Sequence, residues 1–233
     1  MATFTTSWQE AMGTLRKYDL QHTHCQVFFE TGTGLGHSLK HALDNGNFST
    51  LYSSEIHTST AERASTLFAS HPQVHILYSD STTALTSILR EVPSTTPIFF
   101  FLDAHFPGEV EVGYSYEENT PNGVTMPLQE ELQLIRQLRP NAMDVIVVDD
   151  LKLYEDGPFE NGQISNSFAN IPPSWRNLDF VHALFPDKTI EKSYLDDGYL
   201  ILKPHSSNFS LKKLSAGYRI KRTIKKNVAR LLG

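Results

Sequence analysis

Acidic side chains stand at the ends of five apolar runs in this sequence, and a glycine-rich turn follows the first run. In an open parallel sheet, ligands bind beyond the carboxyl ends of the strands, near the point where the strand order reverses. One acid at a strand end is ordinary, but a row of them beside a glycine-rich turn predicts a binding site. The acids are Glu30, Glu55, Asp80, Asp103 and the pair Asp149 and Asp150.

The glycine-rich turn spans Glu30–Gly36. Gly32 and Gly34 allow the backbone to approach a ligand closely and to present amide N–H groups to it. The third glycine of a dinucleotide-binding fingerprint would fall at His37, so that fingerprint fails, and no Lys-Ser or Lys-Thr follows as in a P-loop. A tight strand-to-helix connection without a ligand stays open as the alternative. Glu55, about twenty residues later, suits a carboxylate that accepts hydrogen bonds from two ribose hydroxyls.

These residues, together with a Ser-Asp-Ser stretch around Asp80, resemble the cofactor side of class I S-adenosylmethionine-dependent methyltransferases. The resemblance covers residues 25–203. It implies that Glu30 and the glycine-rich turn hold the methionine part of the cofactor. Glu55 would bind the ribose, and Asp80 with Ser81 the adenine edge. The full set that it implies for cofactor binding is Glu30, Thr31, Gly32, Thr33, Gly34, Gly36, Ser38, Glu55, Ile56, Asp80, Ser81 and Asp103.

A second group of candidate residues combines Asp103 and His105 with the pair Asp149 and Asp150. Their strands should be neighbours in such a sheet, so three carboxylates would lie together. Oxygen ligands in this number favour a hard cation such as Mg²⁺. The pattern is similar to the macrocin-type metal-dependent sugar O-methyltransferases, which implies that Asp103, Asp149 and Asp150 hold the metal. Where that family commonly has its general base this chain has His105, so the catalytic candidates are His105 and Asp103.

Structural alternatives stay open for these residues. Strand-end aspartates often cap the next helix or face water, and His105 can be a hydrogen-bonded scaffold residue. A sugar hydroxyl is a poor nucleophile near neutral pH, so a cation that lowers its pKa and a base in reach would both assist the reaction. His37 and His41 also have the spacing of metal ligands on a helix, but no Glu follows His37, so we expect exposed helix residues there.

The sequence therefore predicts a methyltransferase that moves the methyl group of S-adenosylmethionine to a hydroxyl of a sugar or other small polyol-like acceptor, assisted by Mg²⁺ or another hard divalent cation. A metal-independent methyltransferase, with Asp103 or His105 alone as the base, is the nearest alternative. A nucleotide-dependent oxidoreductase is disfavoured by His37 at the third glycine position. A non-catalytic binding protein of the same fold also stays open.

The elements that must position these residues alternate between strand-like and helix-like runs, which is typical of a parallel sheet covered by helices. We expect an α/β fold with a doubly wound, Rossmann-like, mostly parallel seven-stranded sheet, helices on both faces and an antiparallel terminal hairpin. The predicted strands are Cys25–Phe29, Thr50–Ile56, Val74–Tyr78, Pro97–Leu102, Val145–Val148, Thr189–Leu195 and Tyr199–Leu202. The predicted helices are Ser38–Asn45, Leu128–Leu138 and two that follow caps at Ser59 and Ser81.

Residues 1–204 are predicted to form the methyltransferase domain, with a leading helix within 1–20. The stretch 107–126 is long for a structureless connection, so we expect a lid over the acceptor, with a solvated insert as the alternative. Residues 205–233 are predicted to form a basic amphipathic tail that contacts an anionic membrane surface or an acidic partner. Folding of this tail onto its own acidic body stays open, as does the oligomeric state.

Composition and charge limit the function classes. The 233 residues are 39% hydrophobic, which suits one domain with a sizeable core. The net charge is −6, but nine of the 20 basic residues and none of the 26 acids follow residue 197, so residues 1–197 carry −15. An acidic body argues against nucleic acid as a partner. With Cys25 as the one cysteine, no apolar run of membrane-spanning length and no secretory signal, we expect a cytoplasmic protein.

Overall fold

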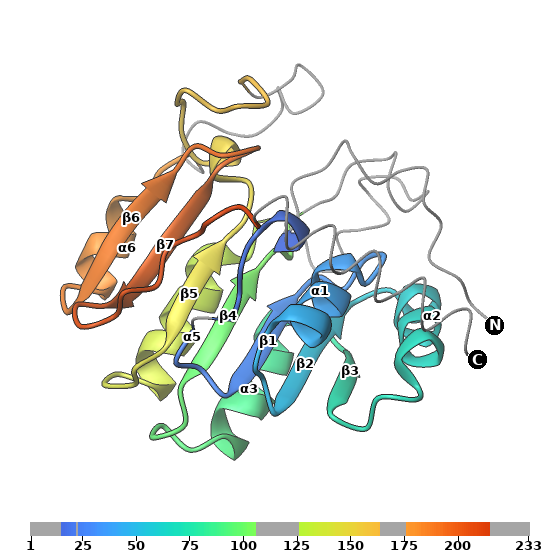
Figure 1. Cartoon of the computed structure of the whole chain (residues 1–233). Coiled ribbons are helices and arrows are strands. Elements are labelled where there is room, and N and C mark those ends of the chain that lie inside the picture. Colours follow the sequence, from blue (N-terminus) through green and yellow to red (C-terminus); the bar gives the residue numbers. More distant parts are fainter. Residues whose placement is uncertain (1–14, 22, 106–125, 164–175, 215–233) are drawn as a thin grey trace.

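A seven-stranded sheet runs through the residues that the computed structural model describes, which are 15–21, 23–105, 126–163 and 176–214 (Figure 1). The strand order is β3-β2-β1-β4-β5-β7-β6. The first five strands run parallel, whereas β7 is antiparallel to both of its neighbours. The strands are β1 Val27–Thr31, β2 Thr50–Glu55, β3 Val74–Tyr78, β4 Ile98–Leu102, β5 Val145–Val148, β6 Lys188–Ser193 and β7 Tyr199–Pro204.

Helices cover both faces of the sheet (Figure 1). Alternate side chains of a strand point to opposite faces, so Phe100 of β4 packs with α3, α5 and α6, while Phe99 and Phe101 pack on the face that carries α1 and α2. Burial on both faces explains the continuous apolar sequence of β4. The helical elements are η1 Leu15–Lys17, α1 His37–Asn45, α2 Thr58–Phe68, α3 Ser81–Glu91, α5 Leu128–Leu138, η2 Leu151–Leu153 and α6 Asp179–Leu184.

The strand order reverses between β1 and β4. The chain places β2 and β3 on one side of β1 and then returns to place β4 on the other side. The carboxyl ends of β1 and β4 are therefore adjacent, and Thr31 lies opposite Leu102 in the register. A switch point of this kind opens the crevice in which α/β proteins bind ligands. The fold class predicted from the sequence is confirmed.

Several predicted boundaries differ from the structure. β1 begins and ends two residues later than the predicted strand Cys25–Phe29, because its pairing with β2 and β4 continues through Thr31. Glu30 and Thr31 therefore belong to the strand and not to the turn. The predicted cap at Ser59 is wrong, since α2 already begins at Thr58 and its N-cap position makes no side-chain hydrogen bond.

The predicted cap at Ser81 is also wrong. Asp80 holds the N-cap position of α3, with the extended backbone that a cap requires, and its carboxylate accepts the N–H of Thr83 at 2.8 Å. Ser81 is the first helical residue and is buried. Its side chain therefore belongs to the interior of the protein.

The terminal hairpin forms as predicted, with Gly198 at a φ of 88° in its turn. Asp196 in the same turn accepts hydrogen bonds from the Tyr18 hydroxyl at 2.6 Å and from the Lys17 ammonium at 2.8 Å. These contacts hold the described start of the chain against the turn between β6 and β7. Leu15–Lys17 is a short 3-10 turn, and Tyr18 pairs with Lys213 in an isolated β-bridge, so the predicted leading helix does not extend to residue 20.

Parts of the predicted domain plan lie outside the described residues. These parts are residues 1–14 of the leading helix, nearly all of the predicted lid and the tail from residue 215. The described start of the predicted tail packs against the body, since Phe209 and Leu211 are buried among the residues on the α1 face of the sheet. Within the described ranges, no helix has the length and apolar character needed to cross a membrane.

Candidate active site

The glycine-rich turn after β1 depends on left-handed backbone angles. Gly32, Gly34 and Gly36 have φ values of 84°, 47° and 73°, a region that favours glycine. A Cβ added to Gly32 would lie 2.5 Å from the backbone oxygen of Asp103, so Gly32 lets the turn pack against the end of β4. A Cβ on Gly34 would meet no described atom within 4 Å. Gly34 is therefore the point at which a ligand can approach this backbone.

Glu55, at the end of β2, binds the same turn. Its Oε2 accepts the N–H of Gly34 and its Oε1 accepts the N–H of His57, each at 3.0 Å. Each carboxylate oxygen has two acceptor positions, so both oxygens can still accept a hydroxyl. Glu55 thus shapes the turn and keeps free acceptor capacity on both carboxylate oxygens.

A buried carboxyl lies below the turn. Glu30 is 1% exposed, and the Ser53 hydroxyl donates to its Oε2 at 2.7 Å. Burial raises the pKa of Glu30 to about 8, the Ser53 hydrogen bond opposes the rise, and the negative charge of Glu55 adds to it. The Thr33 hydroxyl lies 2.7 Å from that of Ser53, which links the turn to this group. A positive charge bound above the turn would stabilise the ionised form of Glu30.

The remaining predicted cofactor residues stand at the same edge of the sheet. Ile56 is 36% exposed directly after β2, and Ser38 is buried in the first turn of α1. The Thr31 hydroxyl accepts the N–H of Asp103 at 3.1 Å, which joins the ends of β1 and β4. Burial raises the pKa of Asp80, but hydrogen bonds from Thr83 and Thr82 outweigh this effect, so its pKa lies below the usual range.

His105 lies between two aspartates that come from different strands. Its Nδ1 is 3.4 Å from Oδ1 of Asp103, and its Nε2 is 2.8 Å from Oδ2 of Asp150. The His105 side chain is 10% exposed, so water screens these contacts only partly. Asp150 adopts a left-handed φ of 49°, which places its carboxylate beside the imidazole. The pairing of β4 with β5 brings these residues together, as the sequence predicted.

The predicted metal ligands lie near one another but do not fit a divalent cation as they are arranged. His105 occupies the position between Asp103 and Asp150. Asp149 is 2% exposed and accepts the N–H of Asp150 at 2.8 Å. Burial, followed by the charges of Asp103 and Asp150, raises the pKa of Asp149 well above its usual range. Across the described ranges, no three His, Cys, Asp or Glu side chains are grouped in a way that could hold an ion.

Sequence reasoning missed one functional candidate, Glu131, whereas the segment Tyr154–Gly162, directly after the Asp pair, is a candidate lining of the acceptor pocket from the sequence. Glu131 is 1% exposed in the first turn of α5. Burial raises its pKa to about 7, whereas hydrogen bonds from the Ser81 and Thr31 hydroxyls and the charge of His105 act in the opposite direction. Burial, then the charges of Glu131, Asp150 and Asp103, raise the pKa of Tyr154 well above its usual range. A signal existed for Glu131, an acid on the otherwise apolar face of its helix.

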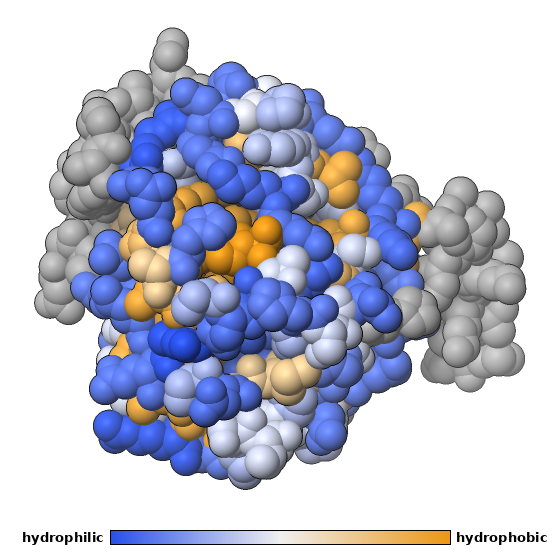
Figure 2. Space-filling model, turned by 90° about the vertical axis from the view of Figure 1, so that its left-hand side faces the viewer, coloured by the Kyte–Doolittle hydropathy of each residue, from blue (hydrophilic) through white to orange (hydrophobic). Residues whose placement is uncertain are grey.

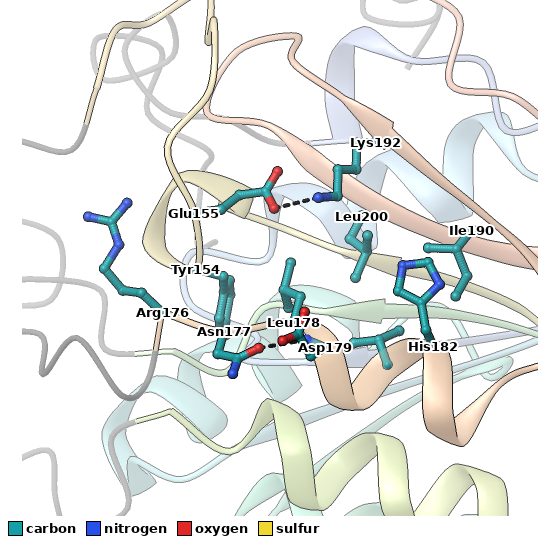
Figure 3. Close-up of a pocket in the computed structure, with 11 residues that line it drawn as sticks. Tyr154, Glu155, Arg176, Asn177, Leu178, Asp179, His182, Ile190, Lys192 and Leu200 are labelled. Carbon is teal, nitrogen blue, oxygen red and sulfur yellow. Dashed lines mark hydrogen bonds and ion pairs between the residues drawn. The ribbon is translucent and has the colours of Figure 1, made fainter.

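A pocket of about 380 Å³ lies between α6, the β6–β7 hairpin and the residues after η2 (Figure 3). Tyr154 lines the pocket, and the charges of Asp150 and Asp103 act on the same side chain. An ion pair between Lys192 and Glu155 at 2.5 Å lies at one wall. The lining combines apolar and polar side chains, which are Tyr154, Glu155, Arg176, Asn177, Leu178, Asp179, Val181, His182, Ile190, Lys192 and Leu200.

The molecular surface agrees with this mixed character. The side of the molecule that carries β6 and α6 shows a hydrophobic patch surrounded by hydrophilic residues (Figure 2). Such a combination suits a small ligand whose apolar ring faces rest on the patch while its polar groups meet the surrounding side chains.

His41 differs from its predicted exposed position. It is 1% exposed, its Nε2 lies 2.7 Å from the backbone oxygen of Tyr18, and its Nδ1 lies 2.9 Å from the Asn45 amide. A carbonyl oxygen can only accept, so Nε2 must carry the proton. His41 is buried because the described N-terminal segment covers the face of α1 that carries it.

Comparisons with known proteins give the fold. No family model matches the sequence, and no curated protein sequence matches it. A SAH-bound methyltransferase from Podospora anserina has a TM-score of 0.50 at 9% identity, covering 78% of this chain and 72% of its own. Spermidine synthase from Thermotoga maritima has a TM-score of 0.49 at 11% identity, covering 92% and 72%.

An O-methyltransferase from Bacillus cereus, also solved with SAH, has a TM-score of 0.46 at 13% identity, covering 76% of this chain and 74% of its own. Identities this low relate the folds and not the activities. The strand order with its antiparallel β7 and the likeness to the Podospora anserina structure agree with each other. The chain therefore has the fold of the class I S-adenosylmethionine-dependent methyltransferases.

Proposed function

We propose that this chain is an S-adenosylmethionine-dependent O-methyltransferase that acts on a hydroxyl of a sugar or other small polyol-like acceptor. The observation that carries the proposal is the placement of His105 between Asp103 and Asp150, beside the glycine-rich turn at the switch point of a methyltransferase fold. A histidine held by carboxylates is a suitable general base, and it lies where the fold binds its cofactor.

The residues at the end of β1 and β2 fit this cofactor. Gly34 is open to a ligand, and Glu55 can accept hydrogen bonds from two ribose hydroxyls. When bound, S-adenosylmethionine supplies a methyl group on a positively charged sulfur. The buried Glu30 carboxyl, which is costly to ionise in the isolated site, favours a cationic ligand above it. A neutral ligand would give the ionised form of Glu30 no such stabilisation.

His105 takes the proton of the acceptor hydroxyl in the proposed reaction. One ring nitrogen binds an aspartate, which fixes the tautomer and stabilises the imidazolium that forms, while the other nitrogen accepts the proton. Nε2 lies 2.8 Å from Asp150 and carries the proton of that hydrogen bond, so Nδ1, which is 3.4 Å from Asp103, is the nitrogen that accepts the proton. A positioned base of this kind contributes about 10²- to 10⁴-fold to the rate.

The pocket beside Tyr154 is the candidate acceptor site. Its polar side chains offer both donors and acceptors, and its apolar ones offer a surface for ring C–H groups. This combination suits a polyhydroxylated ring better than a purely apolar acceptor. The substrate class in our proposal is supported by this lining and by the resemblance of the sequence to sugar O-methyltransferases.

Metal assistance does not enter the proposed steps. The sequence predicts Asp103, Asp149 and Asp150 as ligands, but His105 lies between two of them and the third is buried and hydrogen-bonded. A metal-dependent reaction would require His105 to move away. The arrangement therefore supports the version in which His105 is the base.

Calorimetry tests the cofactor assignment. The protein should bind S-adenosylhomocysteine (SAH) and should not bind NADH. Heat with NADH and none with SAH would favour the oxidoreductase alternative and refute the proposal.

A transfer assay tests the reaction and the role of metal. Methyl-labelled S-adenosylmethionine is incubated with a panel of sugars and polyols, with Mg²⁺ in one series and EDTA in the other. We expect labelled product in both series, and loss of product in EDTA would restore the metal-dependent mechanism. An enzyme that binds SAH but labels only phenolic acceptors would contradict the proposed substrate class.

A further inference from the structure

Glu131 holds a buried carboxylate oxygen that the described chain leaves unsatisfied. The side chain is 1% exposed, and its Oε1 has no hydrogen-bond partner among the described residues. The Ser81 and Thr31 hydroxyls lie near the same carboxylate and lower its pKa. A buried acceptor without a donor is costly, so native proteins rarely leave one. A donor group from a ligand would satisfy this oxygen.

Glu131 lies in the first turn of α5, near two hydroxyls that border the proposed cofactor site. Thr31 is the last residue of β1 and directly precedes Gly32, and Ser81 begins α3 directly after Asp80. Glu131 therefore lies beneath the ends of elements that border the switch-point crevice. The charge of His105 also acts on it, so it lies close to the proposed reacting group.

Glu131 and Glu30 approach the end of β1 from opposite faces of the sheet. Glu30 alternates with Phe29 and Thr31, and Phe29 packs on the face that carries α3 and α5. Glu30 therefore belongs to the opposite face, and Glu131 comes from α5 itself. A ligand above the end of β1 would have a buried carboxyl on each side.

The charged and titratable groups that act on Glu131 give no competing explanation for the open oxygen. They are His105 and Glu130, while the phenol of Tyr154 experiences the charge of Glu131. None of these is recorded as a hydrogen-bond donor to Oε1 among the described residues. The proposed cofactor can supply the missing donor, because its hydroxyl, amine and ammonium groups can all donate hydrogen bonds.

We infer that Glu131 is a binding residue for S-adenosylmethionine, with Oε1 accepting a hydrogen bond from an N–H or O–H group of the cofactor. This inference rests on the proposed function and extends it to a residue in α5. The donor belongs either to the adenosine part or to the methionine part. The two sources are separated by comparing SAH with 5′-methylthioadenosine, which lacks the amino-acid part.

The experiment measures SAH affinity by calorimetry for the wild type, Glu131→Met, Glu131→Gln and the control Glu130→Met. Glu130 lies on the same helical turn and is exposed. We expect Glu131→Met to weaken SAH binding at least twentyfold and Glu130→Met to change it less than twofold. Glu131→Gln keeps the shape of the side chain but cannot ionise, so about a fivefold loss of SAH affinity is expected.

The second probe assigns the donor. A loss with both SAH and 5′-methylthioadenosine places the donor on the adenosine part, and a loss with SAH alone places it on the methionine part. Unchanged SAH affinity in a folded Glu131→Met variant would show that Glu131 is structural and would overturn the inference. If that variant does not fold, unchanged affinity in Glu131→Gln overturns it equally. A wild type that binds no SAH would instead refute the proposed function itself, and the inference with it.

Discussion

At the residue scale, the reaction depends on His105 and its two aspartates. Replacing His105 with Ala should lower kcat by about 10²- to 10⁴-fold, because the acceptor hydroxyl loses its base. SAH affinity should stay within twofold, since His105 is not assigned to cofactor binding. Asp150→Asn, which removes the closer of the two carboxylates, should lower kcat by a smaller factor. Steady-state kinetics with calorimetry of SAH measures both quantities.

The control for this prediction is His205→Ala. His205 is exposed and follows the end of β7. Because β7 is antiparallel to β5, its end lies at the opposite end of the strands from the site. Its loss should leave kcat and SAH affinity unchanged. Equal kcat values for His105→Ala and the wild type would remove the general-base role.

Glu30 gives a second prediction at this scale, about pH. Its pKa is about 8 in the folded protein and about 4.3 in an unfolded chain. Between these values the native state binds more protons than the unfolded state, so stability falls as the pH rises from about 4.3 to about 8. Glu30→Gln removes this titration, and its free energy of unfolding should decline less over that window, by a difference on the order of a few kcal/mol.

Urea unfolding at pH 5, 6.5 and 8 measures the effect of Glu30→Gln. Glu62→Gln is the matched control, since Glu62 is an exposed acid on α2 and should leave the pH profile of the wild type unchanged. Parallel profiles for the wild type and Glu30→Gln would mean that Glu30 is not desolvated as described.

The positions of the strand-end acids could be predicted from the sequence, but their burial and their contacts could not. Asp103, Asp149 and Asp150 follow apolar runs, so their place at one edge of the sheet was predictable from periodicity and strand order. The position of His105 between two of them depends on a left-handed backbone at Asp150, which no local pattern indicated. Glu131 had a sequence signal, as an acid on an otherwise apolar helix face, but its burial results from the packing of α5 against the sheet.

At the element scale, two glycines of the glycine-rich turn should differ in role, since Gly32 packs against the end of β4 and Gly34 lies in open space. Gly32→Ala should destabilise the protein by about 2–4 kcal/mol, since a left-handed residue gains a side chain and the new Cβ meets the backbone of Asp103. Gly34→Ala should cost about 1–2 kcal/mol for its backbone angle alone. Because Gly34 lies in the proposed cofactor site, its variant should also weaken SAH binding.

Gly162→Ala is the matched control for Gly34→Ala. Gly162 has a φ of 81°, and a Cβ on it would meet no described atom within 4 Å. It should therefore show a similar loss of stability with unchanged SAH affinity. Urea unfolding and calorimetry give the two quantities, and equal SAH affinities for Gly34→Ala and Gly162→Ala would contradict the ligand-facing role.

The elements themselves were predictable where burial on both faces produces a continuous apolar run. β5 is such a run and has the predicted bounds. The partly exposed edge strand β3 and the helix α5 behind Pro127 also begin and end as predicted. The end of β1 was misjudged because Glu30 and Thr31 are polar residues in a buried strand. Polar residues of this kind interrupt an apolar pattern at the very positions where a strand enters a binding site, so the sequence signal is weakest there.

At the scale of the whole molecule, opposite charges separate along the chain and partly meet again in the structure. Residues 1–197 carry −15 and the later residues carry nine basic side chains. In the described part of the tail, Lys213 pairs with Glu160 at 2.8 Å and 3.0 Å, and Leu211 is buried. The described start of the tail is therefore attached to the body, which leaves the six basic residues of 215–233 as the candidate contact surface.

We propose that residues 215–233 bring the protein to anionic membrane surfaces, and deletion of this segment tests the idea. The full chain should sediment with phosphatidylserine vesicles in low salt, because each basic residue near such a surface contributes about 1 kcal/mol. A chain that ends at Leu214 should stay in the supernatant with its melting temperature unchanged, since it keeps the buried Leu211. Vesicles of phosphatidylcholine, and 0.5 M salt, should abolish sedimentation of the full chain through loss of the attraction. Equal behaviour of both chains, with a lower melting temperature for the shorter one, would mean that the segment folds onto the acidic body instead.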